Sequence, residues 1–298
     1  MIIYGYTLAF FLLLPPFASA EIYKYKDANG KWQFTDQKPK GAEPEVVGYK
    51  SSEKKEQGPS FHVEQIKGVN YLIAQNPFHA PIMLRLESEQ VPNGKKEWLV
   101  PAQESIKLFQ SRGAIKGYRY RWQLGDPNIS PANQSYHFPV QSQLCAHISQ
   151  SFNGRFSHNK DHSRYAVDIA MDVGTPIVAA RAGTVVGVKD DYHMGGVNEY
   201  FLDKANFIRV LHDDGTFAGY FHILLGTAVV KPGDKVSVGQ VLARSGSSGF
   251  SSGPHLHFVI YQNKGFQQLS IPFQFVTKNE KVIEPVEGLK ICDQLIPQ

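Results

Sequence analysis

Two histidines separated by one residue are the first feature of the sequence that could do chemistry. They lie in Pro254-His255-Leu256-His257-Phe258, whose apolar residues predict a β-strand. Residues i and i+2 of a strand face the same side, so His255 and His257 share a face while Leu256 and Phe258 face the core. Two adjacent imidazoles suit a metal ion. With 11 histidines in 298 residues, roughly 0.4 such pairs are expected by chance, so the pair alone does not identify a site.

A buried-looking aspartate is the second feature. The run Tyr165-Ala166-Val167-Asp168-Ile169-Ala170-Met171 alternates as a strand should, and Asp168 lies opposite its large apolar side chains. The flanking alanines on the same face as Asp168 leave room for a group to approach its carboxylate. A solvent-facing aspartate is the alternative reading. A third element, Tyr220-Phe221-His222, offers one more histidine, although a single histidine in a strand is most often a packed residue.

Short strands and tight turns must position these residues. From about residue 141 the chain alternates β-branched runs with glycine turns such as Lys231-Pro232-Gly233-Asp234, and it shows no useful helical period. We therefore predict an all-β domain of short strands and tight turns over residues 141–278, followed by a C-terminal tail over 279–298. A β-rich accessory domain of small sandwich type is expected over residues 61–140.

The N-terminal region is expected to have three parts. Residues 1–20 form an apolar run ending in Ala18-Ser19-Ala20, which is typical of a cleaved signal peptide, with an uncleaved anchor as the alternative. Residues 21–50 predict a β-hairpin turning at Asn29-Gly30, with Tyr25 and Phe34 among its cross-strand aromatic contacts. Residues 51–60 contain no large apolar residue and are expected to be a linker.

The region from about 150 to 262 resembles the lysostaphin-type zinc endopeptidases of bacterial cell-wall metabolism, the M23 family. The matching stretches run in family order and are Tyr165–Met171, Val173–Ile177, Ala179–Val185, Leu211–Gly215, Tyr220–His222, Lys231–Gly233, Gly239–Gln240 and Ser245–Phe258. The hairpin segment likewise resembles a short module of unknown function found in bacterial envelope proteins. The resemblance implies a lysostaphin-like all-β peptidase domain of short antiparallel strands with an open cleft.

The same resemblance implies a set of site residues. A Zn²⁺ ion would be held by a histidine, Asp168 and His257, while His222 and His255 match the two active-site histidines of the family that do not bind the metal. Three protein ligands and one open position are also what a catalytic zinc site generally has. This sequence departs from the common form at the first ligand, because Arg164 stands where a histidine is usual. We predict that His158 replaces it, since Gly154–Ser157 looks like a subgroup with a longer loop; His162 is the rival.

Two functions remain open at this stage. The first is hydrolysis of amide bonds in the peptide stems or cross-links of peptidoglycan, with a D-alanyl-diaminopimelate link as the first choice of bond and a glycine bridge as the second. The second is a catalytically inactive relative that binds the cell wall or activates an amidase. The presence of Asp168, His222, His255 and His257 favours the enzyme.

Composition limits the partners and the compartment. The net charge of +4 is too small and too scattered for nucleic-acid binding. After removal of the signal segment we expect no membrane span and a monomer that acts on peptidoglycan peptide in the periplasm or cell envelope. In such an oxidising compartment Cys145 and Cys292, the two cysteines of the chain, are predicted to form a disulfide.

Overall fold

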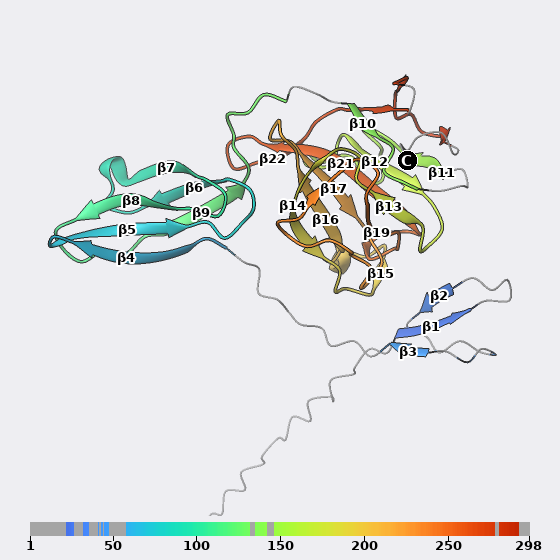
Figure 1. Cartoon of the computed structure of the whole chain (residues 1–298), viewed down its shortest axis with the longest axis horizontal. Coiled ribbons are helices and arrows are strands. Elements are labelled where there is room, and N and C mark those ends of the chain that lie inside the picture. Colours follow the sequence, from blue (N-terminus) through green and yellow to red (C-terminus); the bar gives the residue numbers. More distant parts are fainter. Residues whose placement is uncertain are drawn as a thin grey trace, which may run out of the picture. The chain divides into compact units, whose positions relative to one another are not determined.

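The computed structural model of the chain (Figure 1) describes residues 22–26, 32–35, 41, 43, 45–47, 58–131, 135–141, 146–277 and 280–291. Two predictions lie outside these residues. They are the signal segment at residues 1–20 and the bridge between Cys145 and Cys292, so both stay predictions. The chain divides into two compact units, Met1–Ser51 and Ser52–Gln298.

The described residues are almost entirely β-structure, which confirms the predicted fold class. Their helices are two single 3-10 turns, η1 (Pro92–Gly94) and η2 (Glu199–Phe201). Within this part of the chain no helix is long and apolar enough to span a membrane.

The first unit contains a three-stranded sheet in the order β2-β1-β3, with bounds β1 (Ile22–Lys26), β2 (Trp32–Thr35) and β3 (Glu45–Val47). The predicted antiparallel pairing of β1 and β2 is present. Tyr25 pairs with Gln33, and five residues separate the paired Lys26 and Trp32. The aromatic contacts expected across the two strands involve side chains outside the described ones, so they stay a prediction.

The region between residues 58 and 125 is the small sandwich predicted from sequence. It has one sheet in the order β4-β5-β8 and another in the order β7-β6-β9. Their bounds are β4 (Ser60–Ile66), β5 (Val69–Gln75), β6 (Ile82–Glu87), β7 (Lys95–Val100), β8 (Ser105–Ser111) and β9 (Arg119–Leu124). Leu72 and Leu108 from one sheet and Leu84 and Val100 from the other are buried in one shared core.

A nine-stranded sheet forms the body of the C-terminal region. Eight strands follow the order β18-β14-β16-β17-β21-β12-β11-β25, and β22 pairs with β21. The bounds are β11 (Ala146–Gln150), β12 (Ala166–Ala170), β14 (Gly183–Lys189), β16 (Phe207–Leu211), β17 (Phe217–Phe221), β18 (Lys235–Val236), β21 (His255–Asn263), β22 (Gln268–Ser270) and β25 (Lys290–Ile291). In Figure 1 the long strand β21 lies between β17 and β12, which places it at the centre of the sheet.

Smaller sheets complete this region. They are β10-β23-β24, β13-β19 and β15-β20, with bounds β10 (Ser135–His137), β13 (Pro176–Val178), β15 (Gly195–Gly196), β19 (Val241–Arg244), β20 (Gly249–Phe250), β23 (Gln274–Val276) and β24 (Val282–Ile283). Tyr136 and Phe138 pack in the same large core as Phe258 and Phe275. This core therefore includes residues that precede the expected domain start at residue 141.

The nine-stranded sheet has two differently used faces. Val167, Ile169, Leu256 and Phe258 are fully buried in the large core on one face. The alternate residues of the same strands face the other side, where one end is covered by the sandwich. There Ala80 packs with Phe217, Val259 and Tyr261 in a separate small cluster. The remainder of this second face carries Asp168, His255 and His257.

Candidate metal centre

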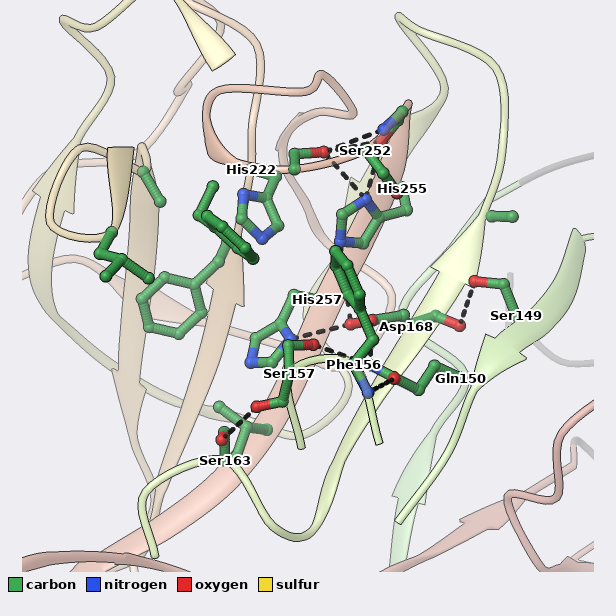
Figure 2. A pocket seen from close by; sticks show the side chains of 18 of the residues that line it. Ser149, Gln150, Phe156, Ser157, Ser163, Asp168, His222, Ser252, His255 and His257 are labelled. Atoms are coloured by element: carbon green, nitrogen blue, oxygen red, sulfur yellow. Dashed lines mark hydrogen bonds and ion pairs between the residues drawn. The ribbon is translucent and has the colours of Figure 1, made fainter. Parts of the chain in front are cut away.

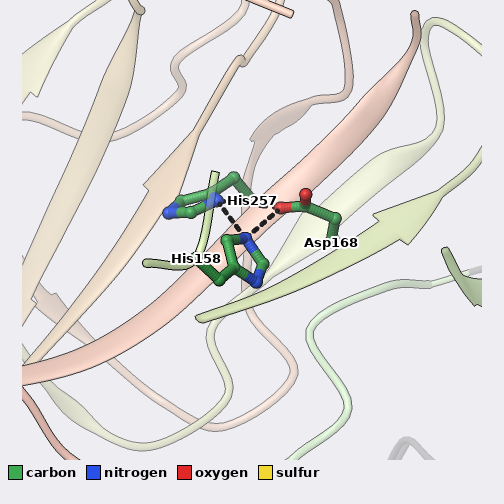
Figure 3. Close-up of side chains that lie close together, drawn as sticks. All are labelled: His158, Asp168 and His257. Atoms are coloured by element: carbon green, nitrogen blue, oxygen red, sulfur yellow. Dashed lines mark hydrogen bonds and ion pairs between the residues drawn. The ribbon is translucent and has the colours of Figure 1, made fainter. Parts of the chain in front are cut away.

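Three potential metal ligands converge on the second face of the sheet. His158, Asp168 and His257 each offer one ligand atom, and these atoms all lie within 4.8 Å of one another (Figure 3). Asp168 on β12 is paired directly opposite His257 on β21. The Asp168 Oδ1 atom lies 2.8 Å from His257 Nδ1 and 3.1 Å from His158 Nε2. Strand pairing thus supplies two of the three groups, and a loop supplies the third.

The loop before β12 holds His158 in one orientation. Its backbone N–H donates to the Gly154 carbonyl at 3.0 Å, and its side chain is fully buried. The Nδ1 atom lies 2.8 Å from the Ser151 carbonyl, which can only accept, so Nδ1 carries the proton. The unprotonated Nε2 therefore faces Asp168 and His257. A backbone carbonyl that fixes the tautomer in this way is typical of metal-binding histidines.

The rival histidine does not join this group. His162 is exposed, and it is not one of the residues whose ligand atoms lie within 4.8 Å of one another. Arg164, at the position where a histidine is usual, is also exposed and pairs with Asp161. Of the two upstream histidines considered from sequence, the structure brings His158 to Asp168 and His257.

Asp168 is held as a carboxylate. Burial on its own would raise the pKa of Asp168, but the close contacts with the rings of His158 and His257 outweigh that effect, and the pKa is lowered well below its usual range. Burial also lowers the pKa of His257, which favours the neutral ring that can bind a metal. A carboxylate and two neutral imidazoles are a donor set that fits Zn²⁺ with one position open.

Gln150 on β11 supports this centre and was missed by the sequence reasoning. Its Nε2 donates to Asp168 Oδ2 at 2.9 Å and to Ser157 Oγ at 2.8 Å. Its Oε1 accepts from the Phe156 N–H at 3.1 Å. The side chain therefore ties the carboxylate to the loop that carries His158. A bulge between Ile148 and Gln150 places Gln150 opposite Asp168, and the sequence offers no signal for that bulge.

Two further histidines lie beside the ligand group (Figure 2). The rings of His222 and His255 have centroids 4.5 Å apart, and His255 Nε2 lies 3.8 Å from Asp168 Oδ1. His222 Nδ1 donates to the Ser248 carbonyl at 2.6 Å, and His255 Nδ1 donates to the Gly253 carbonyl at 2.8 Å. In each ring Nε2 is therefore the nitrogen left without a proton.

His222 occupies an unusual backbone conformation directly after β17. Its φ is 64°, in the left-handed region that non-glycine residues seldom adopt. Its N–H donates to the Asn206 carbonyl at 2.9 Å, which holds the bend. Burial, together with the nearby His255 and His257, lowers the pKa of His222 to about 3, so the ring is neutral at neutral pH.

A cleft of about 670 Å³ lies over these residues. Asp168, His222, His255 and His257 line it, and His158 lies buried behind them. Phe156 and Phe250 stack on each other at its rim with centroids 5.7 Å apart. Among the described residues, none of the sandwich lines the cleft. A substrate can therefore enter the cleft from solvent and reach the group of three potential metal ligands.

Parts of the chain are similar to known proteins. Residues 162–269 match the model of peptidase family M23, and residues 9–59 match a domain of unknown function, DUF4124. Peptidoglycan DD-endopeptidase ShyA of Vibrio cholerae serotype O1 is 29% identical over 201 residues, which are 65% of this chain and 44% of the relative. Glycyl-glycine endopeptidase ALE-1 of Staphylococcus capitis is 36% identical over 96 residues, or 32% of this chain and 24% of the relative.

A solved structure of the catalytic domain of lysostaphin from Staphylococcus simulans is 25% identical, covers 48% of this chain and 89% of that domain, and has a TM-score of 0.30. The chain spans less than half the length of the curated relatives it matches. The family match encloses Asp168, His222, His255 and His257, whereas His158 and Gln150 precede it. Residues 162–269 of this chain therefore form a peptidase domain of family M23.

Proposed function

We propose that this chain is a zinc-dependent endopeptidase that hydrolyses amide bonds in the peptide part of peptidoglycan. The observation that carries the proposal is the convergence of His158, Asp168 and His257 within 4.8 Å at the floor of an open cleft. We assign these three residues as the metal ligands. An inactive wall-binding relative would not need two further oriented histidines beside an intact ligand group.

A zinc ion held there would polarise the scissile carbonyl and lower the pKa of a water molecule. The protein's own part is to orient groups around that centre. Both His222 and His255 keep their proton on Nδ1 and offer Nε2 as an acceptor. Because its pKa is about 3, His222 is a weak base, and we assign it to orienting the attacking water. We assign proton transfer to His255, which lies beside Asp168.

We propose the D-alanyl-diaminopimelate cross-link as the bond that is cleaved, with a glycine bridge as the second choice. The similarity to a DD-endopeptidase covers 65% of this chain, whereas that to a glycyl-glycine endopeptidase covers 32%. We also propose that the chain is exported to the periplasm or cell envelope. The apolar segment Ile2–Leu14 followed by Ala18-Ser19-Ala20 supports export.

The experiment is digestion of purified peptidoglycan sacculi with and without a chelator. Atomic absorption should find about one zinc per chain, in keeping with a three-ligand site. Mass spectrometry of the soluble products should show loss of cross-linked dimers, which chelation abolishes and zinc restores. The Asp168→Ala variant serves as the matched inactive control. Release of products that is insensitive to the chelator, or that persists in this variant, would contradict the proposal.

A further inference from the structure

The cleft contains a cationic side chain that the metal centre does not use. Among the residues that line the cleft, Arg209 is the only arginine or lysine. It lies on β16 between Ile208 and Val210, which are fully buried in the large core. Because successive strand residues face opposite sides, Arg209 projects from the same face of the sheet as Asp168 and His257.

Strand register places Arg209 near the metal centre. Strand pairing aligns one residue of each of β16, β17, β21 and β12 in a row, which consists of Phe207, Phe221, His257 and Asp168. The next row begins two residues further along β16 and consists of Arg209, Gly219, Val259 and Ala166. Arg209 is therefore one row along the strands and two strands across from His257. At about 7 Å per pair of residues and about 5 Å per strand, their Cα atoms are about 12 Å apart. That distance corresponds to about three to four residues of an extended peptide.

No acidic side chain of the described residues serves as a counter-ion for this guanidinium group. Among the described residues Arg209 makes no ion pair, and its buried Nε has no hydrogen-bond partner. Its Cζ lies over the Phe207 ring at 4.5 Å, which orients the group without neutralising it. The nearby Tyr261 hydroxyl is also buried without a partner. The Nε atom of Arg209 and the Tyr261 hydroxyl are thus two neighbouring buried atoms without a partner among the described residues, whereas buried polar atoms in proteins nearly always have one.

We propose that Arg209 binds a carboxylate of the peptide substrate, at the end of the cleft over β16 and β17. A guanidinium forms two parallel hydrogen bonds with a carboxylate, and its planar shape selects that anion. Stem peptides of peptidoglycan carry free carboxylates on either side of their amide bonds. Such a carboxylate is the group of the substrate that Arg209 would recognise. The proposal rests on the proposed function, and Arg209 is a specificity-determining residue at a distance from the reacting atoms, not a catalytic one.

Two synthetic cross-linked stem peptides test the assignment, one with free carboxylates and one with those groups converted to carboxamides. The zinc-loaded wild type should prefer the carboxylate peptide by about 10- to 100-fold in kcat/KM, mainly through KM, as expected for hydrogen bonds to a charged group. Arg209→Met keeps the apolar stem and should reduce this preference to about one. The rate on the carboxamide peptide should not change.

Controls separate a specificity role from a structural one. Arg209→Lys keeps the charge and should retain part of the preference, whereas Arg244→Met, at an exposed arginine outside the cleft, should retain all of it. Zinc content and Tm are measured for each variant. A wild type without the preference, or an Arg209→Met variant that keeps it, overturns the inference.

Failure of the proposed function has a different signature. If the wild type cleaves neither peptide, the two peptides are compared by calorimetry as ligands of the zinc-loaded protein. Tighter binding of the carboxylate peptide to wild type but not to Arg209→Met still supports the role of Arg209. Equal binding of both peptides to the wild type rejects it.

Discussion

The two faces of the nine-stranded sheet are built from alternate residues of the same strands but meet different demands. On one face Val167, Ile169, Leu256 and Phe258 are fully buried among other apolar side chains. On the other face Asp168, His255 and His257 gather at an open cleft. One strand thus contributes to stability with every second residue and to chemistry with the residues between.

The precision of the site derives from the packing of the opposite face. Asp168 lies between Val167 and Ile169, and His257 lies between Leu256 and Phe258, so neither strand can slide without exposing its core residues. Groups carried by rigid strands hold their geometry better than groups carried by loops. Changes on the site face should therefore alter metal binding and turnover, while changes on the core face should alter stability.

The largest expected effect is loss of the metal. Alanine at His158, Asp168 or His257 removes one of three ligands, so each variant should lose stoichiometric zinc and activity while it remains folded. The His162→Ala variant is the matched control and should keep both zinc and activity, because His162 is exposed and outside the ligand group. Atomic absorption after dialysis, with circular dichroism for folding, measures this. Zinc loss from His162→Ala with retention by His158→Ala would reverse the assignment of the first ligand.

A smaller effect is expected at the two histidines that do not belong to the ligand group. His222→Ala and His255→Ala should keep zinc and lose most of their turnover. For His255→Ala the loss in kcat should be about 100- to 10,000-fold, the range of a general acid–base contribution. Because His222 has a φ of 64°, His222→Asn provides a second variant with a residue that tolerates this conformation. Turnover near the wild-type rate in both alanine variants would show that neither ring takes part in the reaction.

At Gln150 we expect metal affinity to be weakened but not lost. Gln150→Ala removes the hydrogen bond to Asp168 Oδ2 and the two contacts with the His158 loop. We expect zinc affinity to fall about 10- to 100-fold, as for other residues that orient metal ligands. Competition with a fluorescent chelator measures the dissociation constant. The control is Gln65→Ala in the exposed strand β4, and an unchanged dissociation constant for Gln150→Ala would exclude the positioning role.

The smallest effect concerns a histidine that packs on the core side. His212 is 3% exposed and lies 5.5 Å from the Tyr136 ring, and burial lowers its pKa to about 4, with Arg181 adding to this and Asp214 opposing it. The unfolded chain takes up a proton near the ordinary pKa of 6.5 while the folded chain does not. Stability is therefore full above pH 6.5 and is lost as the pH falls towards 4.

The contribution of His212 should amount to roughly 2 kcal/mol between pH 7 and pH 5. Urea unfolding at both pH values gives the change in the free energy of unfolding between pH 7 and pH 5. The contribution of His212 is the difference in this change between the wild type and His212→Asn. Zinc affinity at pH 7 should be equal in the two proteins, because His212 is not part of the ligand group. Equal pH dependence of unfolding in the two proteins would contradict the account.

Much of the site could be predicted because its residues lie in strands. Alternation alone put His255 and His257 on one face and Asp168 on the polar side of its strand, and the structure has both arrangements. The resemblance to the M23 family predicted that these segments form one site. The strands Ile22–Lys26 and Trp32–Thr35 could be predicted from alternation, whereas their register could not.

The sequence by itself determined which residues alternate, and therefore the all-β class, the core side of each strand and the inventory of possible ligands. Only the tertiary structure decided which groups meet. The loop before β12 brings His158, and not His162, to Asp168 and His257. Its course depends on contacts with the Ser151 carbonyl and with Gln150. Gln150 reaches Asp168 only because of a bulge, and Arg209 enters the cleft only because β16, β17 and β21 pair in one register. Such contacts join residues far apart in the chain, so their energies depend on the folded arrangement and leave no local pattern.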